Sequence, residues 1–83
     1  MTWQIALTRE AEKCLKRLPR NIVEHAKEAI KEIVSNPRIG KPLKGNLKGQ
    51  FSFRIGDYRV VYILEESLHE IIILYIRHRR DAY

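Results

Sequence analysis

Cysteine is almost absent from this chain of 83 residues, and long apolar runs are absent altogether. The single Cys14 cannot form an intramolecular disulfide and has no second cysteine with which to build a zinc site, so a reducing compartment is expected. No apolar run approaches the roughly 20 residues of a membrane-spanning helix. The N-terminus lacks a basic start followed by an apolar stretch and a small-residue cleavage site. We therefore expect no signal peptide, no membrane partner and a cytoplasmic location.

The length allows one domain, so residues 1–83 are predicted to form a single folded unit. Internal repeats and low-complexity segments are also missing. A chain this short buries a modest core and is marginally stable by itself. A bound partner is one source of the additional stability.

Positive charge exceeds negative charge, with a net charge of +6 and a sequence pI of about 9.8. Residues 8–34 are nearly balanced, with seven basic and five acidic side chains. In residues 36–64 the balance changes, and Asp57 is the one acidic residue. The basic residues of this segment are Arg38, Lys41, Lys44, Lys48, Arg54 and Arg59. This distribution favours a polyanionic partner that binds the second half of the chain.

The first half of the chain predicts one strand and two helices. Apolar and polar residues alternate over residues 3–7, as in a strand with one buried face. A helix is expected next, because Thr8 can cap its first turn and Pro19 cannot continue its hydrogen-bond ladder. Cys14 falls on the apolar face of this helix, where we expect it to pack against the core.

The second helix is predicted to start at Asn21, with Glu24 three residues later in a capping-box arrangement. The Asn36-Pro37 pair stops it. Residues 37–50 contain two prolines, three glycines and three lysines, and we interpret them as a basic loop.

Three strands are predicted in the second half, at residues 51–55, 58–64 and 71–76. Gly56-Asp57 forms a tight turn between the first two strands, and polar residues 65–70 form the next hairpin loop. The last strand is apolar on both faces, which is typical of a central strand. The class is α+β: an N-terminal strand, a two-helix hairpin that covers one face, and a three-stranded antiparallel meander. Trp3, Tyr58, Tyr62 and Tyr75 are interpreted as residues that pack in the core or on a face of the sheet.

Functional side chains follow the last strand directly. His78 to Tyr83 brings a histidine, two arginines and a tyrosine to one edge of the domain, with Arg77 just before them. A guanidinium fork matches the geometry of a phosphate, an aromatic ring can stack on a base, and a phenol can transfer a proton. This ending indicates a site that binds RNA and cuts it.

Arg59 is the strongest candidate within the strands. It interrupts an apolar strand, and a charge in that position needs a partner or a cleft. We favour a functional role over a structural ion pair with Asp57 or with a C-terminal carboxylate. Arg54 and Ser52 share the polar face of the preceding strand, where solvation is the more common fate.

The chain resembles the RelE/ParE superfamily of bacterial and archaeal toxins. The resemblance rests on the order of elements, the segments Asn36-Pro37-Arg38 and Leu43-Lys44-Gly45, the run from Phe51 to Tyr62 and the ending His78 to Tyr83. It implies a RelE-like fold and a type II toxin that is held inactive by a cognate antitoxin in a hetero-oligomer. RelE-like members cut mRNA on the ribosome, whereas ParE-like members target DNA gyrase. We favour the RelE-like branch, with the gyrase toxin and a catalytically inert RNA- or antitoxin-binding domain as alternatives.

The resemblance also implies which residues form the site. Its matching catalytic positions are Arg54, Arg59, Arg79 and Tyr83. Apart from the resemblance, His78 is an alternative proton-transfer group, because histidine suits proton transfer near neutral pH. Ser52 occupies a position that is basic in the family. The expected RNA-binding residues are Ser52, Lys41, Lys44, Lys48, Arg77 and Arg80. The expected reaction uses the RNA's own 2′-hydroxyl as nucleophile, so no metal and no cofactor is predicted.

Overall fold

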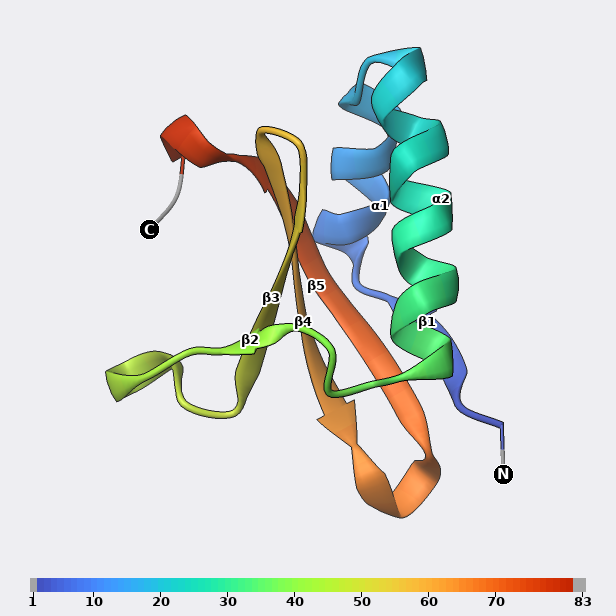
Figure 1. The fold of residues 1–83 in the computed structure, drawn as a ribbon, viewed down its shortest axis with the longest axis vertical. Helices are drawn as coiled ribbons and strands as arrows, with labels where there is room; N and C mark the ends of the chain where they lie inside the picture. The colour runs from blue at the N-terminus through green and yellow to red at the C-terminus, as the bar shows by residue number, and fades with distance from the viewer. Residues whose placement is uncertain (1, 82–83) are drawn as a thin grey trace.

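The computed structural model of the protein describes residues 2–81, the side chain of Asp81 excepted (Figure 1). The regular elements are β1 (Gln4–Leu7), α1 (Arg9–Arg17), α2 (Arg20–Ser35), β2 (Lys41–Pro42), β3 (Gln50–Ile55), β4 (Tyr58–Glu65) and β5 (Glu70–His78). Three 3₁₀ turns complete the described chain: η1 (Gly45–Leu47), η2 (Glu66–Leu68) and η3 (Arg79–Asp81). No helix in this part of the chain is both long and apolar enough to span a lipid bilayer.

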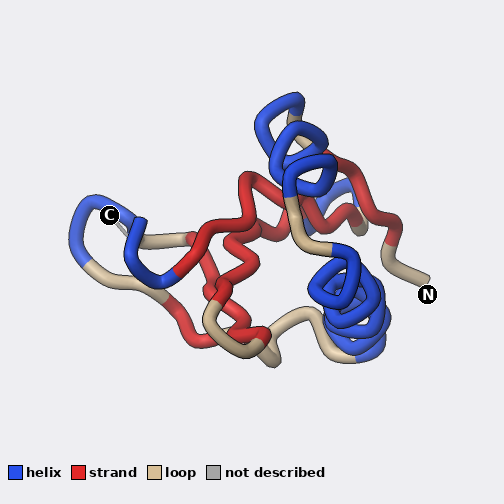
Figure 2. Tube along the Cα trace, turned by 90° about the horizontal axis from the view of Figure 1, so that it is seen from above, coloured by secondary structure: helices blue, strands red, loops and turns tan. Residues whose placement is uncertain are grey.

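The strands form one five-stranded mixed sheet in the order β1-β5-β4-β3-β2. The pair β1–β5 is parallel, and the other three pairs are antiparallel. The two helices lie together on one side of this sheet (Figure 2). The predicted α+β class and the meander β3–β4–β5 are confirmed. The sheet gains a strand that the sequence did not predict, because Lys41 and Pro42, in the basic loop, pair with Ser52 and Phe51 of β3.

The core lies between the helices and the sheet. Helix residues Ala11, Ala26, Ala29 and Ile33 meet strand residues Ile55, Val60, Tyr62, Ile71, Ile73 and Ile76, all of them buried. Cys14 is half-buried and packs against this cluster, as expected. Three small alanines on the helix side allow the helices to approach the sheet closely. The opposite face of the sheet is left without a helical layer.

A bulge in β5 decides which side chains face the helices. Val61 of β4 pairs with Tyr75, but its neighbour Tyr62 pairs with Ile73, so Leu74 has no partner on β4. The Leu74 carbonyl oxygen instead accepts a hydrogen bond from the Thr8 hydroxyl at 2.6 Å. The same hydroxyl oxygen accepts from the Ala11 N–H at 3.0 Å and caps α1, which confirms the predicted cap. The bulge shifts the alternation, so Ile73 faces the helices and Tyr75 faces away from them.

The start of α2 differs from the prediction. The helix begins at Arg20 with Pro19 in the N-cap position and without a side-chain cap. The prediction that Asn21 caps the helix is wrong, because Asn21 lies inside the first turn. The Pro19 carbonyl accepts from the N–H groups of Ile22 and Val23 at 2.9 and 3.0 Å, so Pro19 both ends the first helix and opens the second.

Tyr62 attaches the basic loop to the sheet. Its fully buried hydroxyl donates to the Pro37 carbonyl at 2.8 Å and accepts from the Gly40 N–H at 3.0 Å. Its ring stacks on Phe51 with centroids 5.4 Å apart. A Cβ at Gly40 would lie 2.7 Å from the Tyr62 hydroxyl, so this close approach requires glycine. Burial raises the pKa of Tyr62, and the hydrogen bond from Gly40 opposes that shift.

Candidate nucleic-acid interface

Three arginines form a row across the face of the sheet that the helices leave uncovered. Arg54 of β3 lies directly opposite Arg59 of β4, and Arg59 lies directly opposite Arg77 of β5. Residues paired in this way share a face, with Cβ atoms about 4.5–5.5 Å apart. Like charges directly opposite one another destabilise a sheet. A row of three guanidinium groups, named here the arginine row, is therefore explained better by an anionic ligand than by fold stability.

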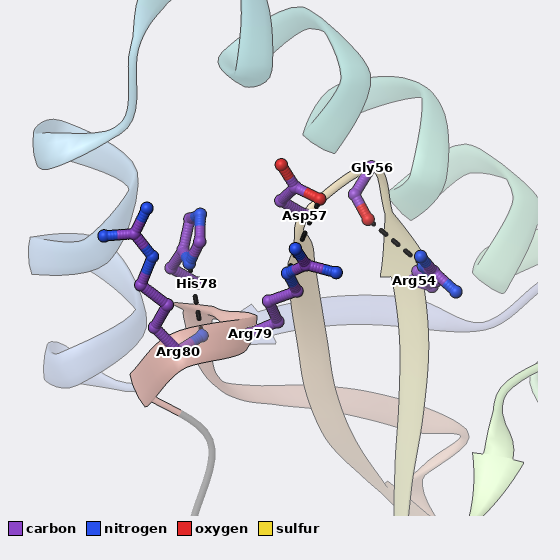
Figure 3. A network of polar contacts seen from close by, with 6 residues as sticks. All are labelled: Arg54, Gly56, Asp57, His78, Arg79 and Arg80. Carbon is purple, nitrogen blue, oxygen red and sulfur yellow. Dashed lines mark hydrogen bonds and ion pairs between the residues drawn. The ribbon is translucent and has the colours of Figure 1, made fainter.

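The outer members of the arginine row are held by different contacts. Arg54 is exposed, and its Nε donates to the Gly56 carbonyl of the β3–β4 turn at 3.2 Å (Figure 3). The Arg77 guanidinium carbon lies over the ring of Tyr75, 4.2 Å from its centroid. Arg59 is half-buried between them. The row thus presents exposed guanidinium groups on both sides of a more deeply set one.

A hollow of about 280 Å³ opens beside the arginine row. Its lining residues are Lys41, Leu43, Ser52, Arg54 and Arg59. Lys41 reaches this place because β2 pairs it with Ser52. The structure therefore brings together the candidates Lys41, Ser52, Arg54 and Arg59. Three of them are positively charged, and the fourth carries a hydroxyl group.

Arg79 lies at the same end of the sheet as the β3–β4 turn, whose Gly56 carbonyl binds Arg54. Its backbone N–H donates to the Asp57 carbonyl at 2.7 Å, and its Nε lies 3.9 Å from Asp57 Oδ1. Both side chains are mostly exposed, so the ion pair itself adds little stability. Figure 3 shows Arg79 and Arg54 at the two sides of the same turn. The backbone hydrogen bond fixes the place where the chain leaves β5.

His78 lies on the other face. It pairs with Tyr58, and the two rings meet edge to face with centroids 5.1 Å apart. It borders a second hollow, of about 380 Å³. The other lining residues are Glu10, Cys14, Arg17 and Leu18 of the α1 region and Tyr58, Ile76 and Arg77 of the sheet. Strand alternation places His78 and Arg77 on opposite faces, although both residues border this hollow at the end of β5. Its Nδ1 accepts a hydrogen bond from the Arg80 N–H at 3.2 Å.

The remaining candidates lie at the margins of this surface. Lys44 and Lys48 are exposed at the two ends of η1, and Arg80 is exposed in η3. These two turns project on the side away from the helices (Figures 1 and 2). Tyr83 lies outside the described residues. A flexible lysine or arginine on such a projection can follow an extended strand of nucleic acid without fixing its position.

Tyr75 belongs to this surface, although the sequence analysis assigned it to packing. It is half-buried on the uncovered face, beside the arginine row. One signal was present in the sequence. Tyr75 and Arg77 are two residues apart in a strand, and such residues share a face.

Comparison with known proteins identifies the class. Residues 5–83 match the family described as "ParE toxin of type II toxin-antitoxin system, parDE". The chain therefore belongs to the ParE/RelE superfamily of type II toxins. It is 39% identical over 83 residues to Toxin RelE of Mycobacterium tuberculosis, covering 98% of this chain and 86% of that toxin. It is 35% identical over 85 residues to Toxin RelG of the same organism, covering 100% and 98%.

Solved structures show the same fold. The toxin-antitoxin complex RelBE2 of M. tuberculosis contains a chain with a TM-score of 0.86 and 33% identity, covering 95% of this chain and 100% of that one. The isolated E. coli RelE toxin has a TM-score of 0.82 at 19% identity, covering 92% and 83%. At that identity the likeness concerns the fold alone.

Proposed function

We propose that this type II toxin is a ribosome-dependent endoribonuclease that cuts mRNA and so inhibits translation. The observation that carries the proposal is the arginine row, which borders a hollow lined by Lys41 and Ser52. Its relatives named RelE support the RelE-like branch. The row has the charge, the exposure and the planar donor geometry that bind a phosphodiester.

The reaction that fits this site uses the RNA's own nucleophile. The 2′-hydroxyl oxygen bonds to the adjacent phosphorus while the bond from phosphorus to the 5′-oxygen breaks. The products are a 2′,3′-cyclic phosphate and a 5′-hydroxyl. One proton leaves the 2′-oxygen and another reaches the 5′-oxygen. Arg54 and Arg59 stabilise the negative charge that develops on the phosphorane, and Arg79 supports it from the edge.

Proton transfer is assigned to Tyr83 in preference to His78. The ring of His78 packs on Tyr58 on the helix side of the sheet, whereas the arginine row lies on the other face. Tyr83 follows η3, the turn that begins with Arg79. In general, guanidinium groups near a phenol favour its tyrosinate form and so lower the cost of ionising it.

The proposed partners are the ribosome with its mRNA and a cognate antitoxin. Two relatives of known structure were crystallised as toxin–antitoxin complexes, RelBE2 of M. tuberculosis and RelBE of E. coli. By analogy with these complexes, the present toxin forms a hetero-oligomer with its antitoxin in the cytoplasm. The basic surface favours an acidic segment in that antitoxin.

Inducible expression in a bacterial host, followed by primer extension on a translated mRNA, tests the function. We expect new 5′ ends inside codons with the wild type and none with Arg59→Gln. Lys13→Gln, which removes an exposed charge from α1, is the matched control and should cleave like the wild type. Intact mRNA together with DNA-damage signalling would contradict the proposal and indicate the alternative, a gyrase-directed toxin.

A further inference from the structure

The contact that holds Arg77 differs in kind from the contact that holds Arg54. The Arg77 guanidinium carbon lies 4.2 Å from the centroid of the Tyr75 ring, whereas Arg54 is held by a carbonyl. Tyr75 is itself supported from the side, because it pairs across the sheet with Val61, which is 1% exposed. The stack therefore holds an exposed guanidinium group on a half-buried ring, and a buried neighbour supports that ring.

Such a stack leaves specific parts of the guanidinium group available. Tyr75 covers one flat face, and the opposite face and the N–H edges remain for a ligand. A phosphate binds the edges of a guanidinium group. A nucleobase binds its flat face, and RNA-binding proteins stack unpaired bases on arginine planes as well as on aromatic rings. Because the ring already orders Arg77, less side-chain entropy is lost when a base binds.

The neighbourhood favours one nucleotide rather than an isolated base. Arg59 lies directly opposite Arg77, at a spacing of about 5 Å between Cβ atoms. A phosphate bound by Arg59 therefore brings the base of an adjoining nucleotide within reach of the exposed face of Arg77. Within residues 2–81 no partner holds the edge donors of Arg77, so they can bind the sugar or phosphate of that nucleotide.

We propose that Arg77, held on the ring of Tyr75, is a stacking platform for one base of the bound mRNA. This inference rests on the proposed function, because RNA is its ligand. The platform accepts every base, since each has a π-face, and it favours purines through their larger ring area. Arg77 thus contacts a base, whereas Arg54 and Arg59 contact phosphates.

Removing the base and removing the platform, singly and together, tests this inference. The probe is a ribosome whose A-site codon carries 2′-O-methyl groups to prevent cleavage and an abasic sugar at each of the three positions in turn. Affinity of the toxin for these ribosomes is measured by co-sedimentation. For the wild type we expect one abasic position to weaken binding by about 5- to 100-fold. Arg77→Lys, which keeps the charge and removes the flat group, should abolish that penalty and leave the salt dependence of binding unchanged.

Two further variants separate stacking from a structural effect. Tyr75→Phe keeps the ring and should keep the abasic penalty, whereas Tyr75→Leu should lose most of it. Arg20→Lys, on the exposed start of α2, is the matched control and should behave as the wild type. Wild-type binding with no penalty at any position would overturn the platform and leave the endoribonuclease proposal intact. The same penalty in Arg77→Lys as in the wild type would also overturn it, and failure of the wild type to bind programmed ribosomes would overturn both proposals.

Discussion

The hydroxyl of Tyr62 accepts a hydrogen bond from the backbone N–H of Gly40 at 3.0 Å, in the interior of the protein. The next residue along the chain is Lys41, which pairs with Ser52 and lines the hollow beside the arginine row. One buried phenol therefore connects the core to the loop that supplies a cation to the site. Removing it should affect both stability and the place of Lys41.

Tyr62→Phe should lower the free energy of unfolding by about 1–3 kcal/mol, because it leaves a buried N–H and a half-buried carbonyl without their partner. Urea denaturation measures this loss. Tyr58→Phe is the matched control, since Tyr58 lies on the same strand and face, and its hydroxyl makes no hydrogen bond within residues 2–81. Equal stability of the two variants would contradict the role of the Tyr62 hydroxyl.

The raised pKa of Tyr62 predicts a pH dependence of stability. Burial is the main cause, so the native state keeps the phenol proton at pH values where the unfolded chain loses it. The stabilisation is complete below the unfolded pKa of about 10 and is lost as the pH rises through the higher native pKa. Urea denaturation from about pH 8 to about pH 11, a range that includes the unfolded pKa, measures the free energy of unfolding. This free energy should decline more steeply with pH in the wild type than in Tyr62→Phe. Parallel curves would contradict this assignment.

The arginine row predicts a conflict between stability and activity. Arg54→Gln removes one of two like charges that lie directly opposite each other, so it should raise the free energy of unfolding by about 0.2–1 kcal/mol. The same change removes a donor to the phosphorane and should slow cleavage by about 10²–10³-fold. Chemical denaturation and single-turnover cleavage on programmed ribosomes measure the two effects. A variant that is less stable than the Lys13→Gln control would show that Arg54 serves the fold.

The helices, the meander and the strand faces of β3 and β4 were predictable because apolar periodicity depends on residues close together in sequence. The sequence did not reveal the bulge at Leu74, since it depends on a hydrogen bond to Thr8, 66 positions away. Without the bulge, the same alternation places Tyr75 with the core. Strand β2 has only two residues, too few for a periodic pattern. The sequence therefore predicted the strand positions of Arg54 and Arg59, but not the register that aligns them with Arg77.

The last prediction concerns the proton-transfer group, for which the sequence left Tyr83 and His78 open. His78 packs on Tyr58 on the helix side of the sheet, and its Nδ1 accepts the Arg80 N–H. His78→Gln should therefore retain cleavage within about tenfold of the wild type, a smaller loss than the 10²–10⁴-fold effect of a general acid or base. Tyr83→Phe keeps the ring and loses the hydroxyl, so binding to programmed ribosomes should persist while cleavage slows by about 10²–10⁴-fold. Single-turnover rates, with binding measured separately, distinguish the two residues. If His78→Gln cleaves more slowly than Tyr83→Phe, His78 is the proton-transfer group and acts from the edge of the sheet. Tyr83 is then at most a stacking residue.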